Sequence, residues 1–225
     1  MKYLAGMTAA ASVAACLSIT SAANAVPLVQ MIGDNDGYGQ GIPDNGNTGT
    51  FAGNPTPPGT DNRSAAEKAA VNGAQFTDLY SALFPGFGAN TTSTGSVIFS
   101  PFAGHLNSAT LQIDMADFQA TTFGPISANI NGVPLSLAFE DGFQNSVVRN
   151  FVLTAAQLAA VNAAGFLQLN LDHGSSADFI AFDYFQLTAD LTPTPLPGAL
   201  PLFATGLGAL GLLAWRRKRK VPATA

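Results

Sequence analysis

Several aspartates early in the chain have the residue type and spacing expected of a cation site. Asp34, Asp36 and Asp44 lie among glycines, and glycine permits the tight turns that let carboxylates converge. Carboxylate oxygens are the ligands that Ca²⁺ prefers. The stretch differs from an EF-hand loop, because the fifth and twelfth positions counted from Asp34 are Tyr38 and Asn45. The alternative is a loop whose Asp and Asn side chains cap their own backbone.

Asp183 lies in an unusual sequence context for a charged residue. Alternation along a strand would place it on the same face as apolar residues such as Ala181 and Phe185. A buried carboxylate needs a hydrogen-bond partner, an ion pair or a metal ion. Two hypotheses follow. Asp183 joins Asp34 and Asp36 around a structural Ca²⁺ ion, or it accepts backbone N–H bonds at a bulge.

Residue patterns that indicate catalysis are scarce. His105 and His173 are the only histidines, and the sequence contains no nucleophile elbow, zinc-protease motif or phosphate loop. Residues 172–176 contain Asp, His and Ser, but neighbours along one turn cannot adopt triad geometry, so we predict a turn between strands. We expect no enzymatic activity. Four acids near strand ends have the chemistry of a glycosidase pair but are expected to be solvated: Asp114, Asp117, Glu140 and Asp141.

The elements that must position these residues are mostly strands. Residues 166–172 alternate, with Leu167, Leu169 and Leu171 on one face. An Asn-Gly pair at 131–132 between apolar runs predicts a hairpin. The last strand is apolar on both faces and should be central in its sheet. The predicted strands cover residues 96–102, 110–116, 126–130, 133–139, 146–153, 166–172 and 179–188.

Two short alanine-rich segments are predicted to be helices. Residues 65–71 open with a capping box that starts at Ser64, and residues 155–163 lie between Thr154 and Gly165. Seven or more strands against two short helices predict an all-β fold, an antiparallel β-sandwich of jelly-roll type.

The N-terminus has the features of a secretion signal. Lys2 is the only early charge, an apolar stretch follows it, and Ala23 and Ala25 supply the small-x-small pattern that signal peptidase accepts. Cleavage there would remove the signal helix in residues 1–25 together with Cys16, the only cysteine. The alternative is a loose lipobox that ends at Cys16, in which this cysteine is lipidated.

The C-terminus combines a proline-rich segment, an apolar segment and a basic cluster, in that order. Residues 192–198 are rich in proline, and residues 199–215 carry no charge. The uncharged segment is predicted to be a transmembrane helix near the lower length limit for crossing a bilayer. The positive-inside rule places the tail, residues 216–225, in the cytoplasm. The residues that stop the membrane segment are Arg216, Arg217, Lys218, Arg219 and Lys220.

Residues 194–220 strongly resemble the PEP-CTERM sorting signal, in a variant where Pro195, Leu196 and Pro197 replace Pro-Glu-Pro. The resemblance implies that exosortase, a membrane-embedded cysteine protease, recognises this tail and cleaves near the prolines. The membrane-tethered form would then be an intermediate. The same tail is also catalogued as an ice-binding protein C-terminal domain, a name that describes the tail and implies no ice binding.

Between the two ends, residues 26–191 are long enough for one domain with a hydrophobic core. Residues 33–62, dense in Gly, Pro, Asn and Asp, are predicted to form a long loop. The domain contains three basic and fourteen acidic residues. Its net charge of −11 argues against nucleic-acid binding. Residues 33–39 and 178–185 resemble anonymous jelly-roll domains found with PEP-CTERM tails. Galactose-binding-like jelly rolls hold Ca²⁺ in a similar arrangement of acids.

Two functions are compatible with these features. The first is a structural or adhesive protein of the cell surface or biofilm matrix, exported through signal peptidase, the inner membrane and exosortase and in contact with exopolysaccharide. The alternative is a Ca²⁺-dependent, lectin-like carbohydrate-binding module. Exposed aromatic rings would favour sugar stacking, and inward-packed rings would favour the structural role. The aromatic residues in or near loops are Tyr38, Phe51, Tyr80, Phe84 and Phe87.

Overall fold

The computed structural model divides the chain into two compact units, residues 25–194 and the two chain ends, 1–24 with 195–225. The residues of the second unit that the structure describes, 203 and 205–211, are helical. Because every named strand and all residues of the hydrophobic core belong to the first unit, that unit has a complete core of its own. The structure describes residues 26–39, 49–50, 60–80, 93–142, 145–193, 203 and 205–211.

The larger of two antiparallel sheets has five strands in the order β1-β9-β4-β7-β2. β1 (Val26–Gly33) pairs with β9 (Ala181–Pro193), which pairs on its other side with β4 (Gly104–Ala116). β7 (Asn145–Val152) pairs with β4, and the short β2 (Gly49–Thr50) pairs with β7. β9 therefore lies inside its sheet, as its apolar faces predict.

The smaller sheet contains the predicted hairpin. Asn131 and Gly132 both have positive φ, as a two-residue type I′ turn requires, and Ile130 pairs with Val133 across it. The strand order is β3-β8-β5-β6, with β3 at Thr94–Phe99, β8 at Leu167–Asp172, β5 at Ile126–Ile130 and β6 at Val133–Leu137.

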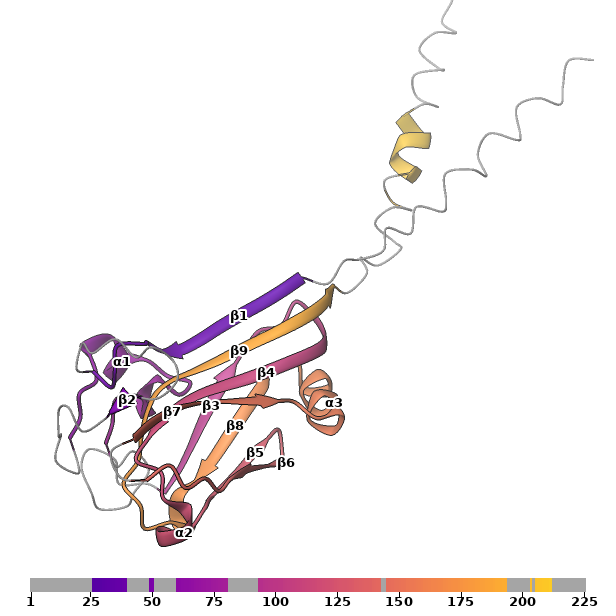
Figure 1. The fold of residues 1–225 in the computed structure, drawn as a ribbon. Helices are drawn as coiled ribbons and strands as arrows, with labels where there is room; N and C mark the ends of the chain where they lie inside the picture. Colours follow the sequence, from indigo (N-terminus) through magenta and orange to yellow (C-terminus); the bar gives the residue numbers. More distant parts are fainter. Residues whose placement is uncertain are drawn as a thin grey trace, which may run out of the picture. The chain divides into compact units, whose positions relative to one another are not determined.

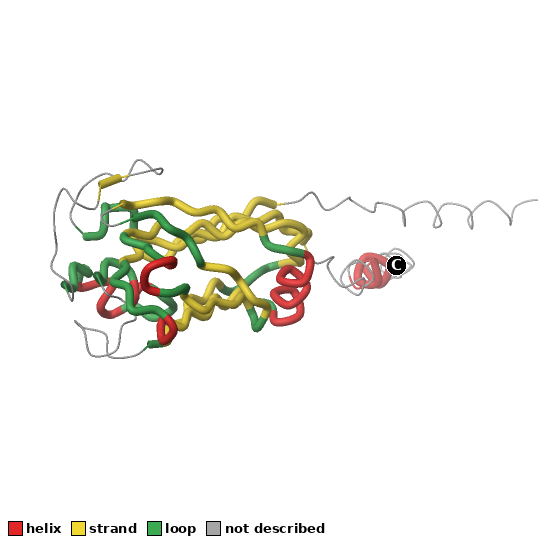
Figure 2. Tube along the Cα trace, turned by 60° about the horizontal axis from the view of Figure 1, so that its bottom comes forward, coloured by secondary structure: helices red, strands yellow, loops and turns green. Residues whose placement is uncertain are grey.

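The two sheets face each other as the layers of a β-sandwich (Figures 1 and 2). One cluster of buried residues joins them, including Val97 and Leu169 from the smaller sheet and Leu111 and Leu187 from the larger one. All seven predicted strands are present. β5 has the predicted bounds, and the other six have shifted ends. β1 and β2 were not predicted. β1 contains Pro27 and its apolar residues do not alternate strictly, so its pattern is that of an edge strand.

Short helices cover the ends of the sandwich. α1 (Ala65–Ala69) and α3 (Ala155–Ala164) both begin with complete capping boxes, which Ser64 and Thr154 provide. Gly165 ends α3 in the left-handed conformation. Two further short elements were not predicted: α2 (Ala120–Phe123) and the 3₁₀ turn η3 (Ala74–Phe76). A second 3₁₀ turn, η4 (His173–Ser175), lies where a turn between strands was predicted.

A bulge in β9 corrects the predicted alternation around Asp183. Ile113 of β4 pairs with Phe185, but two residues later Met115 pairs with Phe182, so β9 holds one extra residue between these pairs. Phe182 and Phe185 consequently both lie in the core, with ring centroids 5.0 Å apart. Asp183 therefore does not share the core face with Phe185, and it lies beside the turn that follows β1 instead.

Most features predicted for the chain ends lie outside the described residues. These are the signal helix, both ends of the transmembrane segment, Cys16 and the residues of cleavage, processing and membrane stop: Ala23, Ala25, Pro195, Leu196, Pro197, Arg216, Arg217, Lys218, Arg219 and Lys220. Within the described part of the chain, no helix combines the length and hydropathy needed to cross a bilayer. β9 continues to Pro193, two residues past the predicted end of the domain at 191.

Candidate metal site

The end of β1 lies beside the start of β9, and this register brings two predicted ligands together. Gly33, the last residue of β1, pairs with Tyr184 of β9 in the antiparallel ladder. Asp34 follows Gly33, and Asp183 precedes Tyr184. The two aspartates are therefore adjacent where the strands separate, although the sequence places them far apart.

The close approach at this point depends on glycine. Gly33 has φ +82°, and a Cβ at this position would lie 2.5 Å from the backbone oxygen of Asp183 and 2.7 Å from Cγ2 of Thr77. Any side chain would force these segments apart, and the positive φ would add strain. Gly33 thus lets β1 end against both Asp183 and the segment that continues from Thr77 into Asp78.

Asp183 accepts two backbone N–H groups from the turn after β1. The donors are Gly37 at 3.4 Å and Tyr38 at 3.3 Å, both long for hydrogen bonds of this type. The side chain is completely buried. The hypothesis that Asp183 accepts N–H bonds at a bulge is therefore confirmed. Asp183 also lies close to Asp34 and Asp36, as the Ca²⁺ hypothesis requires.

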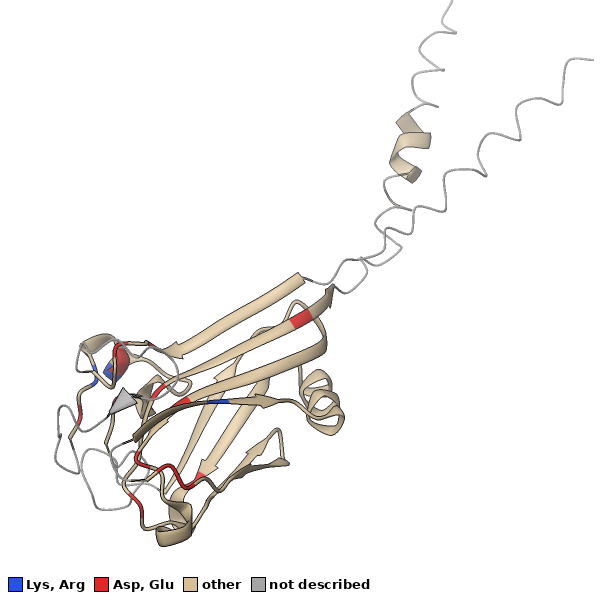
Figure 3. Cartoon of the chain, viewed as in Figure 1, with Lys and Arg blue, Asp and Glu red and all other residues tan. Residues whose placement is uncertain are grey.

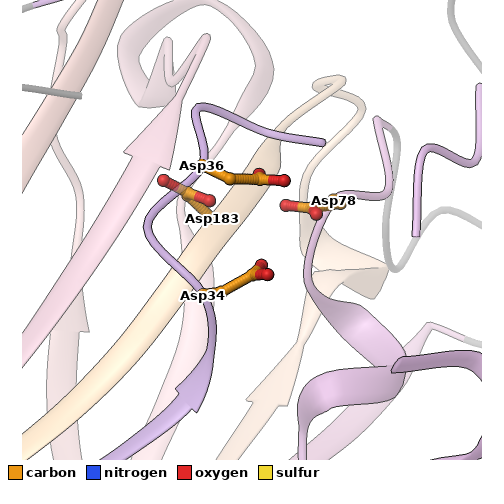
Figure 4. Close-up of side chains that lie close together, drawn as sticks. All are labelled: Asp34, Asp36, Asp78 and Asp183. Atoms are coloured by element: carbon orange, nitrogen blue, oxygen red, sulfur yellow. The ribbon is translucent and has the colours of Figure 1, made fainter. Parts of the chain in front are cut away.

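Asp36 supports its own turn as well as facing the cluster. Its Oδ1 accepts the N–H of Gly39 at 2.7 Å, so the predicted self-capping of this loop is present. The carboxylate also lies beside those of Asp183 and Asp78, as Figure 4 shows. The two interpretations of the acidic loop are thus compatible.

Asp78 is a fourth acid that is absent from the predicted set. Its side chain is 1% exposed, and neither carboxylate oxygen has a hydrogen-bond partner among the described residues. Its backbone is held firmly, because its N–H donates to Phe182 at 2.7 Å and its carbonyl accepts from Asn62 at 3.0 Å. A carboxylate buried without partners is costly unless it holds a proton or binds a cation.

One cation would be able to contact all four carboxylates. Asp34, Asp36, Asp78 and Asp183 each place one carboxylate oxygen within 4.8 Å of the others, and Figure 4 shows the four side chains converging from the turn after β1, the segment after η3, and β9. Ca²⁺ binds oxygen at about 2.3–2.6 Å, so ligands on opposite sides of one ion lie about 5 Å apart. The residues present fit an ion of this kind.

Three acids of the cluster have raised pKa values. Burial, with the charges of Glu67 and Asp183 adding to it, raises the pKa of Asp78 to about 9. Burial also raises the pKa of Asp183 to about 7, although the N–H bonds from Tyr38 and Gly37 favour its charged form. The pKa of Asp34 is raised by partial burial and by the charge of Asp36. A bound cation would remove this repulsion.

No basic side chain in the described part of the chain forms an ion pair with the cluster. Acidic segments gather at the end of the sandwich that carries α1 and α2 (Figure 3). Arg63 and Lys68 of this region pair with Asp61, at 2.9 and 3.7 Å. The ion pairs found among the described residues include none of the four clustered aspartates.

Tyr38 connects the turn of the candidate site to the neighbouring strands. Its N–H donates to Asp183, and its hydroxyl donates to Oδ1 of Asp114 at 2.8 Å and lies 2.8 Å from the Ser146 hydroxyl. Tyr38 is 4% exposed. Asp114 is fully buried, so the expectation that it is a solvated strand-end acid is wrong. The turn after β1 is thus bound to Asp183 through the N–H of Tyr38, and to Asp114 and Ser146 through its hydroxyl.

The remaining residues that the sequence singled out lie outside the four-aspartate cluster. Tyr80 is buried and donates to Asp117 at 2.5 Å, and Asp117 is itself buried rather than solvated. Glu140 is exposed, as expected. His173 is buried in η4, the turn predicted between two strands, and burial lowers its pKa to about 4. Asp44, Phe51, Phe84 and Phe87 lie outside the described residues.

No protein-family model and no functionally curated protein matches the chain. Among solved structures, the crystal structure of dimeric latent PorU from Porphyromonas gingivalis is similar with 10% sequence identity and a TM-score of 0.39. The match covers 75% of this chain and 13% of PorU.

Proposed function

We propose that this chain is an exported protein of the cell surface or extracellular matrix, with a structural or adhesive role, whose jelly-roll-type sandwich is stabilised by Ca²⁺. Asp34, Asp36, Asp78 and Asp183 bind the ion. The observation that carries this proposal is Asp78, a buried carboxylate without a hydrogen-bond partner among the described residues, which faces three further carboxylates. The ion holds the turn after β1 and the segment after η3 against β9.

The donor set favours Ca²⁺ over other biological cations. The cluster consists of carboxylates, which suit hard cations and not Zn²⁺ or Cu²⁺ with their preference for nitrogen and sulfur. Mg²⁺ demands near-ideal octahedral geometry at about 2.1 Å and retains several waters. Two of the four acids are buried, so an ion here loses most of its water, as Ca²⁺ does more readily.

A Ca²⁺ site is consistent with export of the protein, which the features of both chain ends predict. Extracellular modules bind Ca²⁺ with dissociation constants of about 10⁻⁴ to 10⁻³ M, so a site of this kind fills outside the cell. The secretion signal and the PEP-CTERM-like tail support passage through signal peptidase and exosortase, with the inner membrane as an intermediate location. The product would then reside in the cell envelope or matrix.

The described aromatic residues favour the structural role over Ca²⁺-dependent sugar binding. Tyr38 and Tyr80, two of the rings proposed for sugar stacking, are 4% and 7% exposed. Both donate hydroxyl hydrogen bonds to buried aspartates. They pack in a small buried cluster with Ala116 and Ala181, and they offer no stacking surface to a sugar.

A thermal melt of residues 26–193 tests the metal. After removal of metal with a chelator, Ca²⁺ is expected to raise Tm, and Mg²⁺ at the same concentration is expected to raise it less. Asp183→Asn should abolish most of the Ca²⁺ response. Asp190→Asn, at an exposed acid of the same strand, is the control and should keep the full response. An unchanged Tm with Ca²⁺ would contradict the proposal.

Mass spectrometry of the chain expressed with an exosortase tests the sorting. The wild type should lose its basic tail, so that its C-terminal peptide ends near Pro195–Pro197. Replacement of both prolines by alanine should leave the tail attached and the protein in the membrane fraction. Equal processing of both forms would argue against recognition of the proline motif.

A further inference from the structure

A polar groove lies on the smaller sheet, away from the candidate metal site. The groove has a volume of ≈ 480 Å³ and crosses β3, β8 and β5. The residues of these strands that face the core, such as Val97 and Leu169, are fully buried, so the alternate residues face outward. The outward side chains that line the groove are Thr94, Ser96, Ser127, Asn129, Asn170 and Asp172.

The strand register arranges these side chains in two rows. Ser96 and Asn129 both pair with Asn170, and Thr94 and Ser127 both pair with Asp172. Strands lie about 4.8 Å apart and rows on one face about 7 Å apart, so the patch measures about 10 by 7 Å. One or two sugar rings would cover such an area.

Hydrogen bonds fix the orientation of the Asn129 side-chain amide. Its Oδ1 accepts from the Gly132 N–H at 2.9 Å and from the Asn170 amide at 3.0 Å. Asn170 is held in turn by Gln168 at 2.8 Å. Because both bonds engage the oxygen, the NH₂ group of Asn129 is directed away from them and remains a donor for a ligand.

The groove also holds an oriented acceptor and free hydroxyls. Oδ1 of Asp172 accepts the Gly174 N–H at 2.9 Å, which fixes the carboxylate and leaves Oδ2 as an acceptor. The side-chain hydroxyls of Ser96 and Ser127 form no hydrogen bond with any described residue. The lining thus pairs a fixed donor with a fixed acceptor on diagonal residues of the two rows, positions that lie about 7–8 Å apart in a sheet.

This set of groups matches a neutral, hydroxyl-rich ligand. Hydroxyl groups donate to a carboxylate and accept from an amide, whereas an anionic ligand would meet the charge of Asp172 and the net −11 of the domain. The described residues of the lining include no aromatic ring, so they offer no stacking and a single sugar would bind weakly. A polymer would gain strength from several copies.

We propose that this groove binds a segment of neutral polysaccharide. Hydroxyls of the sugar donate to Asp172 and accept from Asn129, with Ser96 and Ser127 completing the contacts. The groove is separate from the four-aspartate cluster and its contacts require no metal ion. The inference is therefore independent of the proposed Ca²⁺ site, and it gives an adhesive matrix protein a surface for its matrix.

Titration of residues 26–193 followed by two-dimensional ¹H–¹⁵N NMR tests the groove. The probes are neutral hexasaccharides of glucose, mannose and galactose and an anionic hexasaccharide of uronic acid, all at one Ca²⁺ concentration. At least one neutral probe is expected to shift amide signals of residues 94–96, 127–129 and 170–172. The uronic acid probe should bind more weakly.

Variants separate the groove from the rest of the surface. Ser127→Tyr places a bulky ring over the lining and should weaken the best probe at least tenfold. Thr188→Tyr, the same change at an exposed strand residue of the other sheet, should leave affinity within twofold, and thermal melts verify that both variants fold. The proposal is overturned by shifts confined to other residues, equal weakening by both variants, tighter binding of the uronic acid probe, or no response to any neutral probe at millimolar concentration.

Discussion

Replacing Asp78 by asparagine should make the metal-free domain more stable, which is the opposite of the usual effect of a buried substitution. Asparagine keeps the shape of the side chain and removes its charge. Its NH₂ group can donate to the neighbouring carboxylates of the cluster. The change also removes one anionic ligand, so the same variant should bind Ca²⁺ more weakly.

The raised pKa of Asp78 determines how much stability the substitution should add to the metal-free domain. An unfolded aspartate with the ordinary value of 3.8 is ionised at pH 7, whereas Asp78 in the metal-free fold, with a pKa of about 9, is protonated. Each unit of pKa difference corresponds to 1.36 kcal/mol, and about three units separate 3.8 from pH 7, so Asp78 costs the metal-free fold about 4 kcal/mol there. For a domain of this size, removal of that cost raises Tm by about 10 °C.

The stability of the metal-free domain should fall as the pH rises. The protonated carboxyl of Asp78 contributes fully to stability below about pH 4. This contribution is lost progressively as the pH rises from about 4 through about 9. The contribution of Asp183 is lost between about pH 4 and pH 7. Between pH 7 and pH 9 the metal-free wild type should therefore lose about 1.4 kcal/mol per pH unit because of Asp78, and the asparagine variant should lose little.

Urea denaturation in the presence of a chelator, at several pH values from 5 to 9, measures both effects. Repetition with Ca²⁺ measures the stabilisation by the metal, which grows with pH in the wild type because binding displaces protons. Asp190→Asn, at an exposed acid, should follow the wild type throughout. A metal-free Asp78→Asn variant that is less stable than the wild type at pH 7 would refute the cost assigned to Asp78. Equal stabilisation of the variant and the wild type by Ca²⁺ would refute the role of Asp78 as a ligand.

Three further substitutions test the surroundings of the site, each by urea denaturation with Ca²⁺ present. Gly33→Ala should lower the free energy of unfolding by several kcal/mol, because the added Cβ would lie 2.5 Å from a backbone oxygen. Gly132→Ala is the control: its φ is similar but the space around it is open, so it should lower the free energy of unfolding by about 1 kcal/mol. Equal losses would contradict the close approach at Gly33. Tyr38→Phe should cost about 1–3 kcal/mol through its lost bond to buried Asp114, and no loss would show that this bond is dispensable. Thr154→Ala should cost about 1 kcal/mol through the helix cap, and an unchanged midpoint would refute it.

Local sequence patterns determined most of the secondary structure. The alternation in β8 and the hairpin at Asn131–Gly132 depend only on neighbouring residues, as do the capping boxes at Ser64 and Thr154. Element ends were less well predicted, and β1 was not, because an edge strand with one exposed side shows no strong alternation. Its position came from pairing with β9.

The candidate site could be predicted in part. Asp34, Asp36 and Asp183 are recognisable as acids in a glycine-rich loop or an apolar strand. Asp78 gives the same signal as Asp183, a lone acid among apolar residues, and that signal could have identified it. Its role depends on contacts across the chain, since its backbone is fixed by Phe182 and Asn62.

The sequence alone thus determined the strand-rich domain, its acidic charge and the signals expected at its two ends, because these depend on composition and on residues close together in the chain. Only the tertiary structure decided which acids meet. The pairing of Gly33 with Tyr184 and the extra residue of the β9 bulge turn Asp183 toward Asp34, and Thr77 packs against Gly33 to bring Asp78 beside them. Register and bulges arise from pairing between distant segments, which no local pattern encodes.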